Sequence, residues 1–336
     1  MRPSAILLAA ALLPFQAASA QTVEQFYKDK QVRLVIPTEA GSEYDIWGRF
    51  VGRHMVPKLP GKPSFLPQNM PGGGQLVGAN YLYSLAPQDG SAFGMIGRNS
   101  PSQALLKVAA VKFDPTQFNW LGSPESTSRV CVAMADAPVK SAKELFDTEL
   151  VMGGEGAGAA ITTTPILVGN LLGMKLKVVP GYAKAADIVL AMERGEVGGV
   201  CQTITAFEGS RPGWIQSGRA RVLFNMERDP IPGLNAPSIF EFVKTEEQRR
   251  IIAFYSSSIE LGRPFAAPPG VPADRLQALR DAFEATTKDK DFLAEAEKMK
   301  LQVTLRTGGE LTALVKELME TPPDIIEKTE SLMTRH

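Results

Sequence analysis

Apolar segments alternate with glycine- and proline-rich turns along the chain, and their spacing predicts a repeating order of strand, turn and helix. In the first third, apolar runs and alternating positions predict strands over 31–37, 64–69 and 91–96. Apolar residues at helical spacing predict helices over 44–58 and around 76–83. Glycine-rich turns between these elements are typical of α/β units.

The remainder of the chain continues this order. Strands are expected over 129–134, 150–152, 176–179 and 197–202, and helices over 161–172 and 183–194. Ser141, followed by Glu144, predicts a helix start with a capping box. After an extended segment over 264–268, helices are expected over 272–287, 291–300, 309–320 and 323–333. Strands that alternate with helices imply parallel sheets covered on both faces.

The beginning of the chain has the pattern of a secretory signal peptide. Arg2 is followed by an apolar run over 5–13, and Ala-Ser-Ala at 18–20 matches an A-x-A cleavage site. A membrane-spanning helix needs about 20 apolar residues, and Pro14 ends this run too early. We therefore expect cleavage after Ala20, export to the periplasm and a soluble mature chain.

Composition narrows the class of protein. The 36 basic and 36 acidic side chains balance, and no basic stripe is present, which argues against a nucleic-acid partner. Because 44% of residues are hydrophobic, the chain is expected to fold rather than remain disordered. Without the leader, roughly 316 residues remain (336 less 20), a length that favours two domains.

Cys131 and Cys201 are the only cysteines in the sequence. An oxidising compartment permits one disulfide between them. The alternative is two separate buried thiols that behave as small hydrophobic side chains. Composition and spacing alone favour neither interpretation.

Motifs for enzyme chemistry are incomplete. Residues 154–159 match G-x-G-x-x-A, but no acidic residue lies between Glu155 and Asp187, where a dinucleotide-binding fold places its ribose ligand. What remains is a glycine turn before a helix N-terminus, which suits an anion. His54 and His336 are the only histidines, and His54 is interpreted as a packed or surface residue. Without a base or a ligand cluster, we expect no catalysis, no cofactor and no bound metal.

Six motifs, in order, resemble the signatures of the tripartite tricarboxylate transporter receptors, also called Bug solute receptors. The first third carries Pro37-x-x-x-Gly41-x-x-x-Asp45-x-x-x-Arg49, then Gln68-Asn69-Met70-Pro71-Gly72-Gly73-Gly74-x-x-x-Gly78, then Ala86-Pro87-x-Asp89-Gly90. Later matches are Gly153-Gly154-x-Gly156, Val179-Pro180-Gly181-Tyr182 leading to Arg194-Gly195-Glu196-Val197, and Ala267-Pro268-Pro269-Gly270-Val271-Pro272. The resemblance runs from about residue 31 to about residue 332.

The resemblance implies an α/β type II periplasmic binding fold, with two lobes joined by two crossover strands and a ligand cleft between them. Lobe 1 is expected over 21–127 and 262–336, and lobe 2 over 128–261. The implied function is capture of a small carboxylate and its delivery to membrane permease subunits of a secondary transporter. A sensor for a membrane histidine kinase and, less favoured, an enzyme on the same scaffold are the alternatives. We also expect a monomer.

The resemblance places the ligand on the loop after the first strand and, in the facing lobe, on the segments 154–162 and 202–205. The candidate ligand-binding residues are Thr38, Ala40, Gly41, Ser42, Glu43, Tyr44, Asp45, Asn69, Arg98, Gly154, Gly156, Ala157, Gly158, Thr162, Gln202, Thr203 and Thr205. It also implies that Cys131 and Cys201 form a disulfide, because the crossover strand would run antiparallel beside the strand over 197–202.

The first loop departs from the family pattern, since Glu39 and Glu43 stand where little charge is usual. Carboxylates beside an anion site repel the ligand unless they point away. Glu43 is interpreted as an acid at a helix start; the alternative is that it binds an amine or hydroxyl of the ligand. Arg98 follows the strand over 91–96 and is a candidate carboxylate clamp. Otherwise it is a surface arginine or pairs with Glu39 or Glu43.

Overall fold

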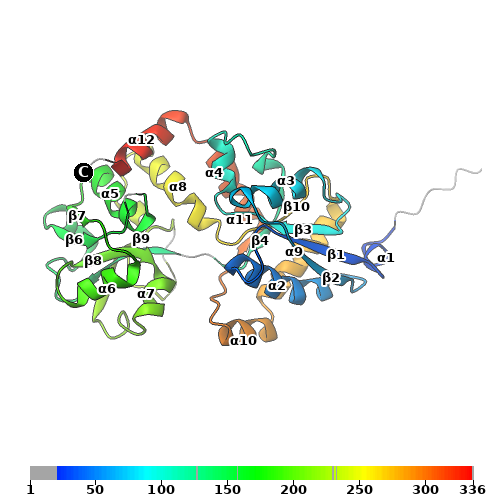
Figure 1. The fold of residues 1–336 in the computed structure, drawn as a ribbon, viewed down its shortest axis with the longest axis horizontal. Helices are drawn as coiled ribbons and strands as arrows, with labels where there is room; N and C mark the ends of the chain where they lie inside the picture. The colour runs from blue at the N-terminus through cyan, green and yellow to red at the C-terminus, as the bar shows by residue number, and fades with distance from the viewer. Residues whose placement is uncertain (1–20, 126–127, 157, 229–230, 232, 335–336) are drawn as a thin grey trace, which may run out of the picture.

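The computed structural model describes residues 21–125, 128–156, 158–228, 231 and 233–334, so the expected signal peptide lies outside the described residues. The described chain forms two α/β lobes joined by two crossover segments (Figure 1). Among the described helices, none is long and apolar enough to span a lipid bilayer.

The first lobe is built on a sheet with the strand order β11-β4-β10-β3-β1-β2. Its strands are β1 (Gln31–Ile36), β2 (Ser64–Asn69), β3 (Ala92–Met95), β4 (Asn119–Ser123), β10 (Phe265–Ala267) and β11 (Arg306–Thr307). β1 runs parallel to β2 and β3, whereas β10 is antiparallel to β3 and β4. The sheet therefore has the predicted parallel strands β2, β1 and β3, with an antiparallel crossover strand added beside β3. β10 is reversed because the chain re-enters from the other lobe at the edge where β3 ends.

Helices cover both faces of this sheet. They are α1 (Val23–Tyr27), α2 (Glu43–Met55), α3 (Leu76–Ser84), α4 (Ser100–Leu105), α9 (Ala273–Thr287), α10 (Lys290–Lys298) and α11 (Gly308–Met319), with short 3-10 turns η1 (Val56–Lys58), η2 (Gly73–Gln75) and η3 (Pro115–Gln117). Leu34 and Ile36 belong to the buried cluster with Trp47 of α2, and Val35 belongs to the cluster with Leu76 of α3. Successive β1 side chains thus point to opposite faces, and both faces are apolar.

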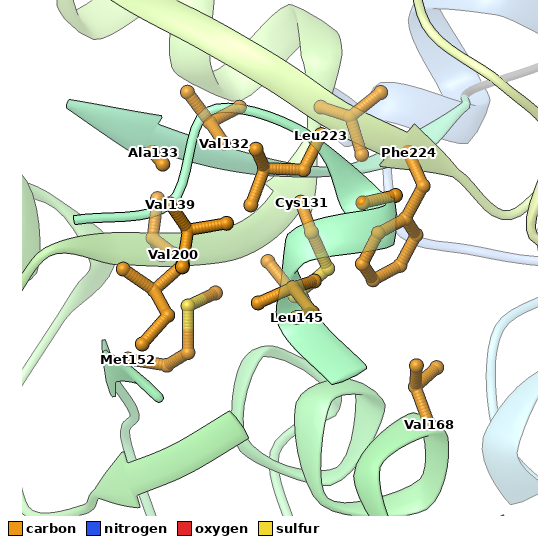
Figure 2. Packing of buried hydrophobic residues seen from close by; sticks show 14 of the residues in the cluster. Cys131, Val132, Ala133, Val139, Leu145, Met152, Val168, Val200, Leu223 and Phe224 are labelled. Carbon is orange, nitrogen blue, oxygen red and sulfur yellow. A yellow bond between two sulfur atoms is a disulfide. The ribbon is translucent and has the colours of Figure 1, made fainter. Parts of the chain in front are cut away.

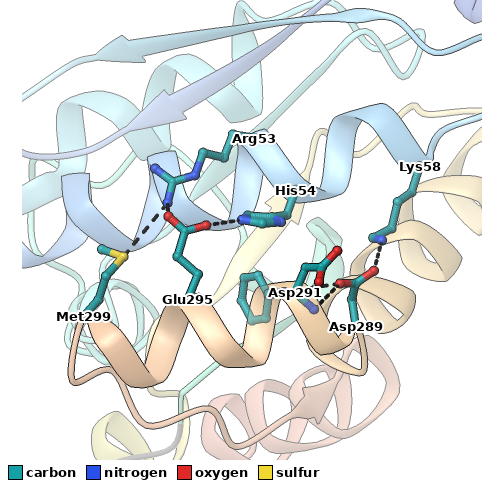
Figure 3. Close-up of polar contacts among 8 residues, drawn as sticks. Arg53, His54, Lys58, Asp289, Asp291, Glu295 and Met299 are labelled. Carbon is teal, nitrogen blue, oxygen red and sulfur yellow. Dashed lines mark hydrogen bonds and ion pairs between the residues drawn. The ribbon is translucent and has the colours of Figure 1, made fainter.

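Three polar contacts join α10 to the helical segment formed by α2 and η1 (Figure 3). Glu295 pairs with Arg53, and its other oxygen lies 2.7 Å from Nε2 of His54. Lys58 pairs with Asp289 at 2.5 Å. His54 also packs edge-on against the ring of Phe292. His54 therefore has the packing role that the sequence analysis favoured.

The second lobe is built on a sheet with the order β7-β6-β8-β5-β9. Its strands are β5 (Arg129–Met134), β6 (Leu150–Gly153), β7 (Leu176–Val179), β8 (Gly199–Thr203) and β9 (Ala220–Asn225). Its helices are α5 (Ala160–Leu172), α6 (Ala185–Glu193), α7 (Ile204–Ser210) and α8 (Glu246–Glu260). Two 3-10 turns, η4 (Ala142–Phe146) and η5 (Ile239–Phe242), complete the lobe. The capping box predicted at Ser141 is not formed, because its hydroxyl donates to Glu144 (3.2 Å) and caps no backbone N–H.

A disulfide joins β5 to β8 in the core of the second lobe (Figure 2). The two strands are antiparallel, and Cys131 lies directly opposite Cys201 in their register. Their Cα atoms are 4.0 Å apart. Both cysteines are buried in one cluster with Leu145 and Phe224. This is the pairing that the family resemblance implies.

The two crossover segments lie against each other. The first runs from β4 to β5 and the second from α8 to β10. Gly262 has φ +62°, and a Cβ there would stand 1.7 Å from the carbonyl oxygen of Glu125 on the first crossover. Only glycine fits this contact. The Ser123 hydroxyl accepts the Arg263 N–H at 2.9 Å, so a hydrogen bond also ties the crossovers together.

The last helix, α12 (Pro323–Thr334), departs from the expected division of the chain. The sequence analysis assigned 262–336 to lobe 1, whereas α12 packs against α5 and α8. Ile325 and Leu332 share a buried cluster with Leu167 and Ile251. The apolar face of α12 is thus buried beside the second sheet, although α9 and α11 cover the first.

Candidate functional site

The carboxyl ends of the parallel strands meet at one edge of each sheet, and the crossovers join these two edges. In the first sheet β1, β2 and β3 end there, and β4 leads from the same edge toward β5. In the second sheet β6 and β8 end where β5 begins. The loops selected by the sequence analysis therefore face one another from the two lobes (Figure 1). Ligands of open α/β sheets lie at such strand ends.

Hydrogen bonds within the chain hold the loop after β1. The carboxylate of Asp45, only 4% exposed, accepts the Gly41 N–H at 2.9 Å and the Asn69 amide at 2.8 Å. The same Asn69 amide donates to the Thr38 carbonyl at 2.9 Å. Ser42 caps α2 by accepting the Asp45 N–H at 3.2 Å. Asp45 and Asn69 therefore support the loop from beneath.

These contacts also fix the charge of Asp45. Burial alone would raise the pKa of its carboxyl group. The Gly41 N–H, the Asn69 amide and the Arg49 guanidinium, 2.8 Å away, outweigh burial and hold the pKa of Asp45 below its ordinary value. Asp45 is thus ionised and paired at neutral pH.

Glu43 lies in the first turn of α2, and its carboxylate is 2.5 Å from Nη2 of Arg263. The position matches the interpretation of Glu43 as an acid at a helix start. Arg263 also stands over the ring of Tyr44, 4.8 Å from its centroid, and 3.5 Å from Glu125. Burial opposes the charge of Arg263, but Glu43, Glu125 and Tyr44 together raise its pKa.

Arg98 follows β3 at the same edge. Its backbone N–H donates to the Tyr44 hydroxyl at 3.0 Å. The residue is half-buried, and within the described part of the chain its guanidinium forms no ion pair. The pairing with Glu39 or Glu43 that the sequence left open is therefore absent from these residues. Arg98 instead lies within electrostatic range of Arg129 in the other lobe.

The second lobe presents the N-terminus of α5. Its N-cap is Ala159, so no side chain caps the first-turn N–H groups. Gly154 lies against Thr162, since a Cβ on Gly154 would stand 2.9 Å from the Thr162 hydroxyl oxygen. That hydroxyl is buried and has no hydrogen-bond partner among the described residues. An uncapped helix start with an unused donor beside it suits an anion.

Arg129 opens β5 at this edge and was not among the expected site residues. Its Nη1 donates to the Thr164 hydroxyl of α5 at 3.3 Å, whereas Nε is buried without a partner in the described structure. The Tyr255 hydroxyl of α8 lies 2.7 Å from the same Thr164 hydroxyl. Burial lowers the pKa of Arg129, and the positive charge of Arg98 adds to this effect. No carboxylate of the described residues pairs with Arg129.

The end of β8 completes this edge. Gln202 is 5% exposed, and its side-chain Nε2 has no hydrogen-bond partner in the described part of the chain. Thr203 caps α7 by accepting the Ala206 N–H at 3.3 Å, and Thr205 donates to the Thr203 hydroxyl at 3.3 Å. Gln202 thus adds a second unused donor near Arg129, whereas Thr203 and Thr205 engage one another.

Other expected residues make fewer contacts. Ala40, Gly156 and Gly158 are exposed. A Cβ at Gly156 or Gly158 would meet nothing within 4 Å, so neither glycine is required by a close neighbour here. Ala157 lies outside the described residues. A ligand contact at these positions stays a prediction.

The arrangement offers donors and positive charge at both edges. The donors are the α5 N-terminus, the Arg129 and Arg98 guanidiniums, and the Thr162 and Gln202 side chains. Such a set stabilises an anion, and a carboxylate fits a guanidinium bidentately. Among the described residues, no three His, Cys, Asp or Glu side chains are grouped to hold a metal ion.

Comparison with known proteins gives one curated relative and several solved structures. No family model matches the chain. The UPF0065 protein in the gbd 5′ region of Cupriavidus necator is 24% identical over 333 residues, which cover 96% of this chain and 94% of that protein.

Among solved structures, a TctC solute binding protein from Polaromonas superposes with a TM-score of 0.71 at 18% identity, covering 90% of this chain and 99% of the other. The periplasmic binding protein BugD gives 0.50 at 19% identity, covering 91% and 98%. An R. palustris protein solved with adipate gives 0.51 at 18% identity, covering 90% and 97%. The chain therefore has the fold of the TctC- and Bug-type solute-binding proteins, which confirms the resemblance predicted from its sequence motifs.

Proposed function

We propose that this chain is a periplasmic solute-binding receptor that captures a small carboxylate and delivers it to the permease subunits of a tripartite tricarboxylate-type transporter. The fold is shared with proteins described as solute-binding and periplasmic binding proteins. One of the structures that share it was solved with adipate. For this chain, the carboxylate ligand, the periplasmic location and the permease partner are all proposed.

One observation carries the choice of ligand: Arg129 is a half-buried cation at the strand-end edge, its Nε is buried without a hydrogen-bond partner, and it pairs with no carboxylate of the described chain. A buried charge is costly unless it is paired. Arg129 contacts Thr164 near the start of α5, whose N-terminus no side chain caps, and the Thr162 hydroxyl on the same helix is unpartnered in the described chain. A ligand carboxylate supplies the missing charge and accepts from all these donors, whereas a neutral amide supplies no charge.

Replacement of Arg129 by Gln tests the proposal. We expect Arg129→Gln to weaken binding of an acid more than tenfold, because loss of one partner of a buried charged pair costs about 2–5 kcal/mol. Thermal shift with a panel of carboxylates and their matched amides identifies the acid, and titration calorimetry on wild type and variant gives the affinities. We expect the same direction for Arg98→Ala.

Arg221→Gln is the matched control. Arg221 is also a half-buried arginine of the second sheet, on β9, but it donates to the backbone carbonyls of Lys140 and Ala135 away from the site. Its replacement should leave affinity unchanged. Equal stabilisation by acids and amides, or equal affinity in Arg129→Gln and wild type, would contradict the proposal.

A further inference from the structure

Arg263 lies on the second crossover, and its side chain is only 5% exposed. Its guanidinium contacts acids from two separate segments. Nη2 is 2.5 Å from Glu43 at the start of α2, and Nε is 3.5 Å from Glu125 on the first crossover. The buried cation therefore joins both crossovers to the loop after β1.

The same guanidinium is connected to Arg98. It stands over the ring of Tyr44, and the Tyr44 hydroxyl accepts the backbone N–H of Arg98 at 3.0 Å. Tyr44 is 7% exposed, so its ring is held between these two arginines by packing. Arg263 thus supports the backbone of Arg98 through Tyr44.

Glu43 is the acid that Arg263 compensates. Its side chain is 61% exposed and lies in the first turn of α2, directly after the loop that follows β1. An uncompensated carboxylate within a few ångströms of a bound anion repels it, and near a protein surface this lowers affinity by about tenfold or more. A site that accepts an anion needs this charge neutralised.

We propose that Arg263 is a positioning residue that determines specificity: by pairing with Glu43 it compensates the carboxylate at the start of α2 and lets the site accept an acid. This inference rests on the proposed function, since it concerns the same site. Arg263 acts through Glu43 and Tyr44. Its Nη2 and Nε are engaged by Glu43 and Glu125, so these atoms are not presented to a ligand.

The inference also assigns Glu43 a role. If Glu43 bound an amine or hydroxyl of the ligand, its carboxylate would have to be available. Instead it is engaged by Arg263. Glu43 is therefore dispensable for acid binding, and its removal leaves an extra positive charge near the site.

The test uses calorimetric titration of the full mature chain with adipate at low ionic strength; where adipate gives no heat, succinate, citrate and benzoate follow in turn. We expect Glu43→Gln to bind the acid as tightly as wild type or about two- to fivefold more tightly, since Arg263 already compensates Glu43 in wild type and the exposed carboxylate is screened by solvent. Arg263→Gln should weaken binding about tenfold or more. The double variant Arg263→Gln/Glu43→Gln should return to within about threefold of wild type.

The dependence of affinity on salt distinguishes an electrostatic role of Arg263 from a packing role. If Glu43 repels the acid in Arg263→Gln, raising ionic strength should restore part of the lost affinity, because exposed charges are screened. Arg263→Lys, which keeps the charge, should bind more tightly than Arg263→Gln. Neither result is expected if Arg263 only maintains the fold.

The possible outcomes distinguish a failure of the proposed function from a failure of this inference. Failure of every acid to bind wild type contradicts the proposed function and removes this inference with it. Acid binding in wild type with no loss in Arg263→Gln, or no rescue in the double variant, overturns the inference alone. Should Arg263→Gln fail to fold, Glu43→Gln still decides, because a loss of affinity in that variant shows that Glu43 contacts the ligand.

Discussion

Glu260 is buried at the end of α8, beside the second crossover, and is only 1% exposed. Nε of Arg228 is 3.4 Å from its carboxylate, and Arg228 also pairs with Glu317 of α11 at 3.0 Å. Glu227 lies nearby and pairs with Arg306 of β11 at 2.7 Å. Burial raises the pKa of Glu260 to about 7; Arg228 opposes this and Glu227 adds to it.

This pKa predicts a pH dependence of stability. Below about pH 4.5, Glu260 is protonated in both folded and unfolded chains. As the pH rises from about 4.5 to about 7, the unfolded chain loses the proton and the folded chain keeps it, so the free energy of unfolding falls and then levels off. The loss should be on the order of 3 kcal/mol. Glu260→Gln should lack this fall.

Urea unfolding of wild type and Glu260→Gln at pH 5, 6, 7 and 8 measures the difference. The variant should gain stability relative to wild type as the pH rises. A difference that stays constant across the series would show that Glu260 does not hold its proton in the folded chain.

At the scale of elements, the disulfide ties β5, the first strand of the second sheet to enter from the crossover, to β8. It closes a loop with a sequence separation of 70 residues. In the chain-entropy model, a loop of this length stabilises the fold by roughly 4 kcal/mol. We expect reduction to lower the denaturant midpoint of this lobe.

Guanidinium unfolding of oxidised and reduced protein checks this expectation, and thiol titration under denaturing conditions checks the starting state. The Cys131→Ala/Cys201→Ala variant should resemble the reduced protein and respond to no reductant. Two titratable thiols in the untreated chain, or identical midpoints with and without reductant, would contradict it.

The elements that periodicity predicted have a clear apolar pattern and are bounded by turn residues. β2, β5 and β7 have their expected bounds, and α5 and α11 begin within one residue of the prediction. The strands β4 and β9 and the helix α8 were not anticipated from the pattern. α8 packs its apolar residues against α12 and α11, which come from the far end of the chain, so its partners are not visible locally.

Some residues of the candidate site could be predicted from the sequence, and others could not, for a similar reason. The loop after β1 and the turn before α5 carry glycine motifs that can be recognised in the sequence. Arg129 is the first residue of β5 and Arg263 precedes β10 by two residues, and neither belongs to a recognised motif. Their importance depends on which charges the fold leaves unpaired or compensated. An arginine at the first position of a crossover strand was the one available signal.

For the whole molecule, the two lobes meet through the crossovers and through α12, which follows lobe 1 segments but packs on α5 and α8. The division into 21–127 with 262–336 and 128–261 stays a proposal, with α12 placed on the second lobe. Ion pairs of Arg228 and Arg306 also join the two sides. If the lobes move on ligand binding, the crossovers must bend. The packing of α12 and these two ion pairs would then have to adjust with them.

The most direct test of the account is a crystal structure with the acid found by the thermal-shift screen. The account predicts one ligand carboxylate within hydrogen-bond distance of Arg129 Nε and of the first-turn N–H groups of α5, with Arg98 approaching from the other lobe. Glu43 should remain paired with Arg263 in the complex. An acid bound elsewhere, for example in the pocket between α8 and α11 lined by Phe254 and Leu314, with Arg129 untouched, would contradict it.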